Sequence, residues 1–176
     1  EALTKAGDCE GFQPGSVRRA LAYFDDQALH AMMIDIDGFD ALGVDASEEP
    51  LAAIEEFVST MLPPAFQDAG YHWQLSNSFG HESKGDKLHA HLWFWLDEAL
   101  TSAQLKAWAK ATKLAADLSL FNPVQIHYTS GPQFDSGVLD PWLKRSGYVP
   151  GIPGSDGRTL DSVLLDVPAE LLAAEA

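Results

Sequence analysis

The strongest constraint on the fold of this chain is the alternation of side chains between residues 87 and 95, KLHAHLWFW. Successive side chains of a β-strand point to opposite faces of the sheet, so residues two apart share a face. The alternation predicts a strand over residues 88–96 with one buried face and one face that carries a cation and two imidazoles. The buried face would hold Leu88, Ala90, Leu92 and Phe94, and the polar face Lys87, His89 and His91, followed by Trp93 and Trp95.

A second strand is predicted over residues 29–36, an apolar run that ends at the turn Asp37-Gly38. Asp35 and Asp37 flank Ile36, so both carboxylates leave the same face of this strand. Two hard oxygen ligands at the end of an apolar strand suit a pair of Mg²⁺ or Mn²⁺ ions. A simple Asp-Gly turn is the alternative. Metal binding is favoured because two like charges on one strand face are costly without cations.

The remaining elements follow from capping residues and periodicity. Ser47, followed by two acids and Pro50, opens a helix that Pro63 stops. Thr101 or Ser102 opens a second helix that ends near Asp117. This order of elements predicts one α+β (α/β) domain over residues 1–176, an RRM-like palm sheet with helices packed on it, with about residues 1–15 and 151–176 peripheral. The other predicted elements are strands at 71–76 and 124–129, short helices at 16–26 and 141–145, and a C-terminal helix from Pro168.

Composition limits the environment and the partners. A single cysteine, Cys9, allows no disulfide framework and no cysteine zinc site, which indicates a reducing compartment. No apolar run approaches the roughly 20 residues of a membrane span, and the first residues show no signal-peptide pattern, so a cytoplasmic protein without membrane contact is expected. The net charge of -15 is opposite to that of most nucleic-acid-binding domains. Any nucleic acid would have to be held by a local cationic strip.

The ordered motifs provide a family resemblance. Asp35-x-Asp37 followed by Lys87-x-His89-x-His91 resembles the archaeo-eukaryotic primase superfamily, whose motifs are DxD, an sxH often preceded by lysine, and a hydrophobic residue followed by aspartate. Ala116-Asp117 matches the third motif. The stretch from Asp117 to Pro132, with Asp140-Pro141 and Arg145 after it, looks like the RepB-like primase-polymerases of plasmids, phages and integrative elements. The resemblance covers about residues 29 to 150.

The resemblance implies a function and a set of roles. It implies a primase/DNA polymerase that uses two Mg²⁺ or Mn²⁺ ions, nucleoside triphosphates and a single-stranded DNA template, with a possible replicative helicase module as partner. His91 would contact the nucleotide phosphates and Lys87 would neutralise them. His89 stands where the family has a small serine, which would alter the nucleotide pocket and leaves the preferred sugar open. The carboxylates implied to bind metal are Asp35, Asp37 and Asp117, and the further nucleotide-binding candidates are Ser76, Tyr128 and Arg145.

Simpler roles and rival functions stay open. Ser76 also suits a turn, Tyr128 a core position and Arg145 a solvated helix end, while Trp93 and Trp95 form either a stacking platform or a surface under a helix. His89-Ala90-His91 fits the metal motif of HUH endonucleases, with Tyr128 or Tyr148 as nucleophile, although that function leaves Asp35 and Asp37 without a role. Residues 35–39 resemble the metal strand of diguanylate cyclases, but the chain lacks their Gly-Gly-Asp/Glu-Glu-Phe hairpin. The acidic charge also suits a non-catalytic binding domain.

Overall fold

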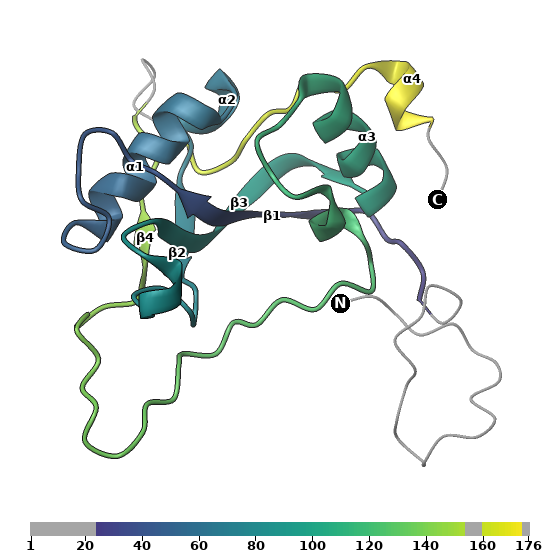
Figure 1. The fold of residues 1–176 in the computed structure, drawn as a ribbon. Coiled ribbons are helices and arrows are strands. Elements are labelled where there is room, and N and C mark those ends of the chain that lie inside the picture. Colours follow the sequence, from purple (N-terminus) through teal and green to yellow (C-terminus); the bar gives the residue numbers. More distant parts are fainter. Residues whose placement is uncertain (1–23, 154–159, 174–176) are drawn as a thin grey trace, which may run out of the picture.

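The computed structural model describes residues 24–153 and 160–173, which form an α+β fold around one antiparallel sheet (Figure 1). The sheet has four strands in the order β1-β3-β2-β4. The elements are β1 (Leu29–Phe39), α1 (Pro50–Met61), α2 (Pro64–Gln67), β2 (Tyr71–Leu75), the 3₁₀ helix η2 (Glu82–Lys84), β3 (Leu88–Leu100), α3 (Ser102–Thr112), the 3₁₀ helix η3 (Leu118–Phe121), β4 (Ser146–Val149) and α4 (Ala169–Leu172).

The strand β3 is the centre of the fold. It pairs with β1 on one side and β2 on the other, both antiparallel, so that β1 and β2 run parallel with β3 inserted between them. Together with α1, these strands make a split β-α-β unit. The register places Asp35 opposite His91 and Asp37 opposite His89. On the other side of β3, Gln74 lies opposite His91.

The hydrophobic core lies between one face of this sheet and the helices. Alternation along β1 and β3 buries the predicted set of apolar side chains, and Phe94 is only 2% exposed. Phe66 of α2 packs edge-on against Phe94, with ring centroids 4.9 Å apart, and also contacts Trp108 of α3. From α1, Ile54 and Phe57 are buried in the same core. The helices α1, α2 and α3 therefore cover one face and leave the other face of the sheet for polar side chains (Figure 1).

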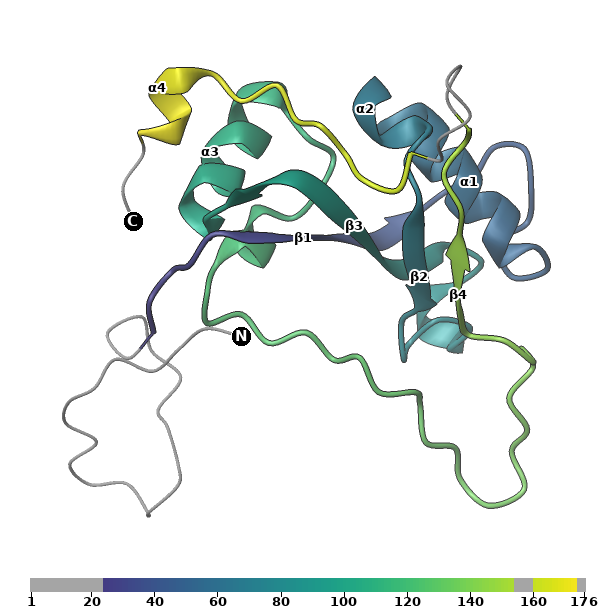
Figure 2. The ribbon, with the colours of Figure 1, turned by 180° about the vertical axis from the view of Figure 1, so that it is seen from behind.

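Part of the open face is crossed by a long extended segment rather than by a helix. After η3 the chain runs without regular structure past the sheet and returns to it as β4 (Figure 2). One anchor of the segment is the Gln74 amide, whose Nε2 donates to the Thr129 carbonyl at 2.8 Å. Residues 124–129, predicted as a strand, are thus part of this segment. The prediction was wrong because residues 146–149 pair with the edge of β2 instead.

Three helix predictions also need correction. The first helix begins at Pro50 and not at Ser47, whose hydroxyl bonds to Asp45 in the preceding turn. The second helix ends at Thr112 because Lys113 adopts a left-handed conformation with φ of 54°. Residues 141–145 form a loop, since Asp140 accepts bonds from both the Trp142 amide and the Arg145 side chain. Of the helix predicted over 16–26, only residues 24–26 are described and they are not helical; Cys9 and residues 1–15 lie outside the described ranges.

The segment after residue 151, expected at the periphery, contributes to the core. Val163 is fully buried and bridges Leu96 in parallel, and its carbonyl accepts from the Asp97 amide at 3.0 Å. This segment fills the end of the sheet beyond β2. Within the described part of the chain, none of the helices is both long enough and apolar enough to cross a membrane.

Candidate functional site

Two carboxylate–imidazole pairs stand side by side on the open face of the sheet. His91 Nε2 lies 3.4 Å from Asp35 Oδ1, and His89 Nδ1 lies 2.9 Å from Asp37 Oδ1. Both contacts follow from the register, because directly opposed residues of an antiparallel pair project from the same face. The strands predicted to carry these groups are therefore neighbours, and their functional side chains face the same side.

The two pairs differ in how far they are buried. The His89 side chain is 7% exposed, whereas the Asp37 carboxylate that it contacts is 73% exposed. His89 therefore lies below Asp37 and holds this carboxylate toward solvent. Gly38, which follows Asp37, has φ of +91°, and a Cβ there would lie 3.6 Å from His89 Cε1. Gly38 lies within β1 at an irregularity of the β1–β3 register, not in the predicted turn, and its positive φ favours glycine there.

A lysine that the sequence analysis did not identify, Lys84, lies next to Asp37. Its Nζ lies 3.5 Å from the same Asp37 Oδ1 that contacts His89. Lys84 comes from η2, in the loop between β2 and β3, where no alternation or helical spacing points to a site. Lys87 is exposed, and its aliphatic stem lies beside Gly38. Two lysines thus flank the Asp37 end of the site.

Burial and four titratable neighbours act on the pKa of Asp35. Burial raises the pKa of its carboxyl above the usual value, and the neighbouring carboxylates Asp37 and Asp117 raise that pKa further. His91 and His127 act in the opposite direction and lower the Asp35 pKa. Burial and the two like charges therefore outweigh the two imidazoles, and a bound metal ion would stabilise the ionised Asp35 carboxylate.

His127 is a second residue that the sequence analysis missed. It lies in the extended segment that crosses the open face, and it lines a cleft of about 370 Å³ together with Asp35, His91 and Asp117. Burial lowers the His127 pKa, as does the nearby His91. A hydrogen bond with the Leu120 backbone and the charge of Asp35 favour its protonated form. No spacing in the sequence points to His127, because the tertiary path of the extended segment after η3 brings it to the cleft.

Asp117 has a structural role as well as a place in the cleft. It is the N-cap of η3, and its two carboxylate oxygens accept from the amide and the hydroxyl of Ser119 at 2.8 and 2.6 Å. These bonds lower the pKa of Asp117. The same residue lines both the cleft next to His91 and a second cleft, of about 560 Å³, with Asp35 and Asp37. The three predicted acidic residues therefore border one open region.

The acidic residues do not form a complete metal cage by themselves. Among residues 24–153 and 160–173, no three His, Cys, Asp or Glu side chains lie close enough together to coordinate one ion. This arrangement still fits Mg²⁺ or Mn²⁺, because such ions are often bound by one or two carboxylates together with the phosphates of a substrate. Asp35 and Asp37 would supply the carboxylates, with Asp117 at the margin of the site.

The other predicted nucleotide-binding residues are spread around the cleft. Ser76 lies just after β2, and its hydroxyl is 3.2 Å from that of Ser78, with both residues on the cleft wall. Tyr128 is 70% exposed and also lines the cleft. Arg145 is engaged elsewhere: its Nε donates to Asp140 at 2.6 Å, one terminal nitrogen reaches the Ser76 carbonyl at 3.4 Å, and its guanidinium stacks on Trp142. Arg145 thus secures the loop before β4.

The raised pKa of Asp35 predicts a stability effect with a definite sign. An acid whose pKa is higher in the folded state destabilises the fold when ionised, and this effect is absent below the unfolded-state value of 3.8 and grows as the pH rises above it. We expect Asp35→Asn to raise the Tm by roughly 2–4 °C at neutral pH, which corresponds to relief of about 1 kcal/mol. The gain should shrink in thermal melts as the pH is lowered toward about 4.

Asp45→Asn is the matched control with the opposite sign. Hydrogen bonds from Ser47 lower the pKa of Asp45, so its ionised form stabilises the fold at neutral pH. This variant should lower the Tm, and its deficit should fade as the pH falls below the usual carboxyl range. A neutral or lowered Tm for Asp35→Asn at neutral pH would contradict the conclusion that the ionised Asp35 carboxylate destabilises the fold.

No family model matches the chain, and neither a curated protein nor a solved structure does so. The geometry of the site and the resemblance of its motifs are therefore the observations that bear on function.

Proposed function

We propose that this chain is a metal-dependent, template-directed nucleotidyltransferase, a primase/DNA polymerase of the archaeo-eukaryotic primase type that acts in the replication of a plasmid, phage or other mobile element. The observation that carries the proposal is the cross-strand pairing of Asp35 with His91, with Asp37 and Asp117 at the same open region. The order of motifs along the chain supports the same conclusion. The β1-β3-β2 core, with helices on one face and the polar groups on the other, is compatible with an RRM-like palm.

Asp35 and Asp37 would hold the divalent ions, Mg²⁺ or Mn²⁺. Such ions, when bound, make the attacking 3′-hydroxyl more acidic and stabilise charge on the pyrophosphate leaving group. The raised pKa of Asp35 supports this role, because burial and the nearby carboxylates make the ionised form costly and a bound cation would offset that cost. The exposure of Asp37 supports it too, since an ion shared with a substrate must be reached from solvent.

The histidines and lysines would act on the phosphates. His91 lines the cleft, and its Nε2, which lies 3.4 Å from Asp35 Oδ1, would donate to a phosphate oxygen and stabilise charge that develops during transfer. Lys84 and Lys87 lie at the Asp37 end of the site and would balance the charge of the triphosphate. His89 would act indirectly, by holding Asp37 in place. In such a reaction, positioning and electrostatics do most of the work and no covalent nucleophile is needed.

One observation favours a second candidate function, an HUH-type endonuclease acting on single-stranded DNA. His89 and His91 share a face, and Tyr128 lines the same cleft as His91. A tyrosine in that position could attack a phosphodiester of the DNA, forming a bond to the 5′-phosphate of one fragment and releasing the other with a 3′-hydroxyl. Against this function, the His89 side chain is almost fully buried, and the function leaves Asp35 and Asp37 without a role.

The deciding experiment uses the whole chain in two parallel reactions. The first contains Mn²⁺, labelled nucleoside triphosphate and a single-stranded DNA template, with and without a primer. The second contains Mn²⁺ and 3′-labelled single-stranded DNA without nucleotide. Template-dependent products in the first reaction alone support the polymerase. Cleavage, or a covalent protein–DNA adduct, in the second reaction would replace it with the endonuclease.

A further inference from the structure

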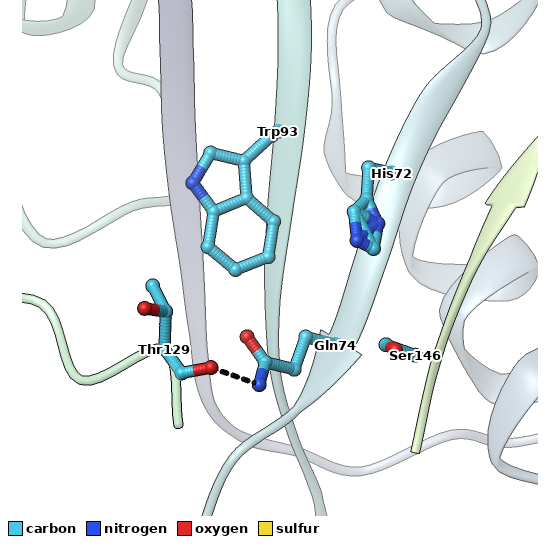
Figure 3. Close-up of a pocket in the computed structure, with 5 residues that line it drawn as sticks. All are labelled: His72, Gln74, Trp93, Thr129 and Ser146. Carbon is cyan, nitrogen blue, oxygen red and sulfur yellow. Dashed lines mark hydrogen bonds between the residues drawn. The ribbon is translucent and has the colours of Figure 1, made fainter. Parts of the chain in front are cut away.

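A small pocket adjoins the candidate site on the open face of the sheet (Figure 3). It has a volume of about 300 Å³ and combines an indole, an imidazole, an amide and two hydroxyls. Trp93 and His72 stand opposite each other in the β2–β3 register, and their rings approach to 5.5 Å between centroids. The side chains that line the pocket are His72, Gln74, Trp93, Thr129 and Ser146.

The pocket continues the His91 cleft along three separate parts of the chain. On β3, Trp93 follows His91 on the same face, and its ring meets the His91 imidazole edge-on at 5.7 Å. On β2, Gln74 of the pocket precedes Ser76 of the cleft by two residues, and in the crossing segment Thr129 directly follows Tyr128. The two hollows therefore lie next to each other, so a ligand with phosphates at His91 would extend into the pocket.

The polar atoms of the pocket are held in defined orientations. Gln74 Nε2 donates to the Thr129 carbonyl, which leaves the Gln74 side-chain oxygen as an acceptor. His72 Nδ1 lies 2.9 Å from the Gly147 carbonyl, which can only accept, so Nδ1 carries the proton and Nε2 is the acceptor of the neutral ring. The Thr129 and Ser146 hydroxyls can donate or accept. This is the composition of a site for a flat heteroaromatic ring: a stacking surface with a few adaptable polar groups.

We infer that this pocket binds the base of the nucleotide whose phosphates occupy the Asp35–His91 site, with Trp93 as the stacking surface. The inference rests on the proposed function, which supplies the phosphate end of the ligand. Stacking on an aromatic ring tolerates every base, because each base has a π face, and this suits a template-directed enzyme. It also provides affinity without phosphate contacts, which a chain with a net charge of -15 needs.

The test measures binding of three ligands in the presence of Mn²⁺ by titration calorimetry: a non-hydrolysable nucleoside triphosphate, inorganic triphosphate and a single-stranded oligonucleotide. We expect Trp93→Ala to weaken nucleotide binding by about 5- to 150-fold, the usual range for loss of a stacking ring. Binding of inorganic triphosphate should not change. Trp93→Phe should retain most of the nucleotide affinity, because it keeps an aromatic face.

Trp95→Ala is the matched control. Trp95 lies on the same strand and is 57% exposed, but it stacks on His30 outside the pocket, so its loss should leave nucleotide binding unchanged. A folded Trp93→Ala protein with wild-type nucleotide affinity would overturn the inference. An equal loss of affinity for inorganic triphosphate in Trp93→Ala would also overturn it, because Trp93 would then act through His91. A loss of affinity confined to the oligonucleotide would overturn it as well.

The same titrations separate failure of the inference from failure of the proposed function. If the wild-type protein binds inorganic triphosphate as tightly as the nucleotide, the proposed function stands. The inference of a base-binding pocket is then wrong. If the wild-type protein binds neither the nucleoside triphosphate nor inorganic triphosphate, the proposed function is wrong. In that case the free nucleoside is titrated: binding that depends on Trp93 supports the pocket, and no binding overturns it.

Discussion

Replacement of Asp35 or Asp37 by asparagine is expected to reduce template-dependent incorporation by about a thousandfold or more. A carboxylate that binds a catalytic ion contributes several kcal/mol to the transition state, and each 1.36 kcal/mol corresponds to a factor of about ten in rate. Asparagine keeps the volume and a carbonyl oxygen, so the contacts with His91 or His89 can persist while the charge is removed. Single-turnover incorporation with Mn²⁺ measures the effect.

Thermal melts connect the same substitutions to metal binding. An ion that binds only the folded protein stabilises it by about 2.7 kcal/mol at a hundred times its Kd, or roughly 5–10 °C for a chain of this size. Mn²⁺ should therefore raise the Tm of the wild type and have little effect on Asp35→Asn or Asp37→Asn. Glu98→Gln is the control, because it removes one charge from an exposed part of β3 outside the clefts. Variants that keep both the Mn²⁺ shift and the wild-type rate would remove these carboxylates from the mechanism.

The strands that carry the site were predictable because their signal is local. Alternation along residues 29–36 and 88–96 assigned both the buried and the polar faces, and the structure buries Ile34 and Leu92 as expected. The same reasoning failed for residues 124–129, which also alternate. A strand requires a partner, and partner choice is non-local: the edge of β2 pairs with 146–149. Alternation within a segment cannot reveal that competition.

The composition of the site was predictable only in part, for the same reason. The shared face of two neighbouring strands was predictable from alternation, and it brings together Asp35, Asp37, His89 and His91. Lys84 lies in a 3₁₀ turn and reaches Asp37 because the β2–β3 loop folds back over the strand ends. His127 reaches Asp35 from a segment that has no regular structure. Loops place such groups through tertiary contacts, so sequence spacing does not show them.

The two histidines of β3 should respond very differently to substitution if the site is a polymerase. His91→Ala is expected to lower incorporation by about 10²- to 10³-fold, the usual cost of losing one hydrogen bond to charge that develops in the transition state. His89→Ser should cost less activity, about 10- to 100-fold, because His89 orients Asp37 and does not itself meet the phosphates. Serine is too short to reach Asp37 from the floor of the site, so this variant should also melt at a lower temperature.

In an HUH endonuclease the pattern would be different, because both histidines would bind the same ion. His89→Ser and His91→Ala would then lose metal-dependent activity equally, and a tyrosine variant would lose the covalent adduct. Tyr128 is the candidate to test, since Tyr148 lies on β4 and its hydroxyl donates to Asp161 at 3.2 Å. We expect Tyr128→Phe to incorporate nucleotides at close to the wild-type rate and no variant to form an adduct with 3′-labelled DNA. Equal losses for the two histidine variants, together with an adduct that disappears in Tyr128→Phe, would establish the endonuclease in place of the polymerase.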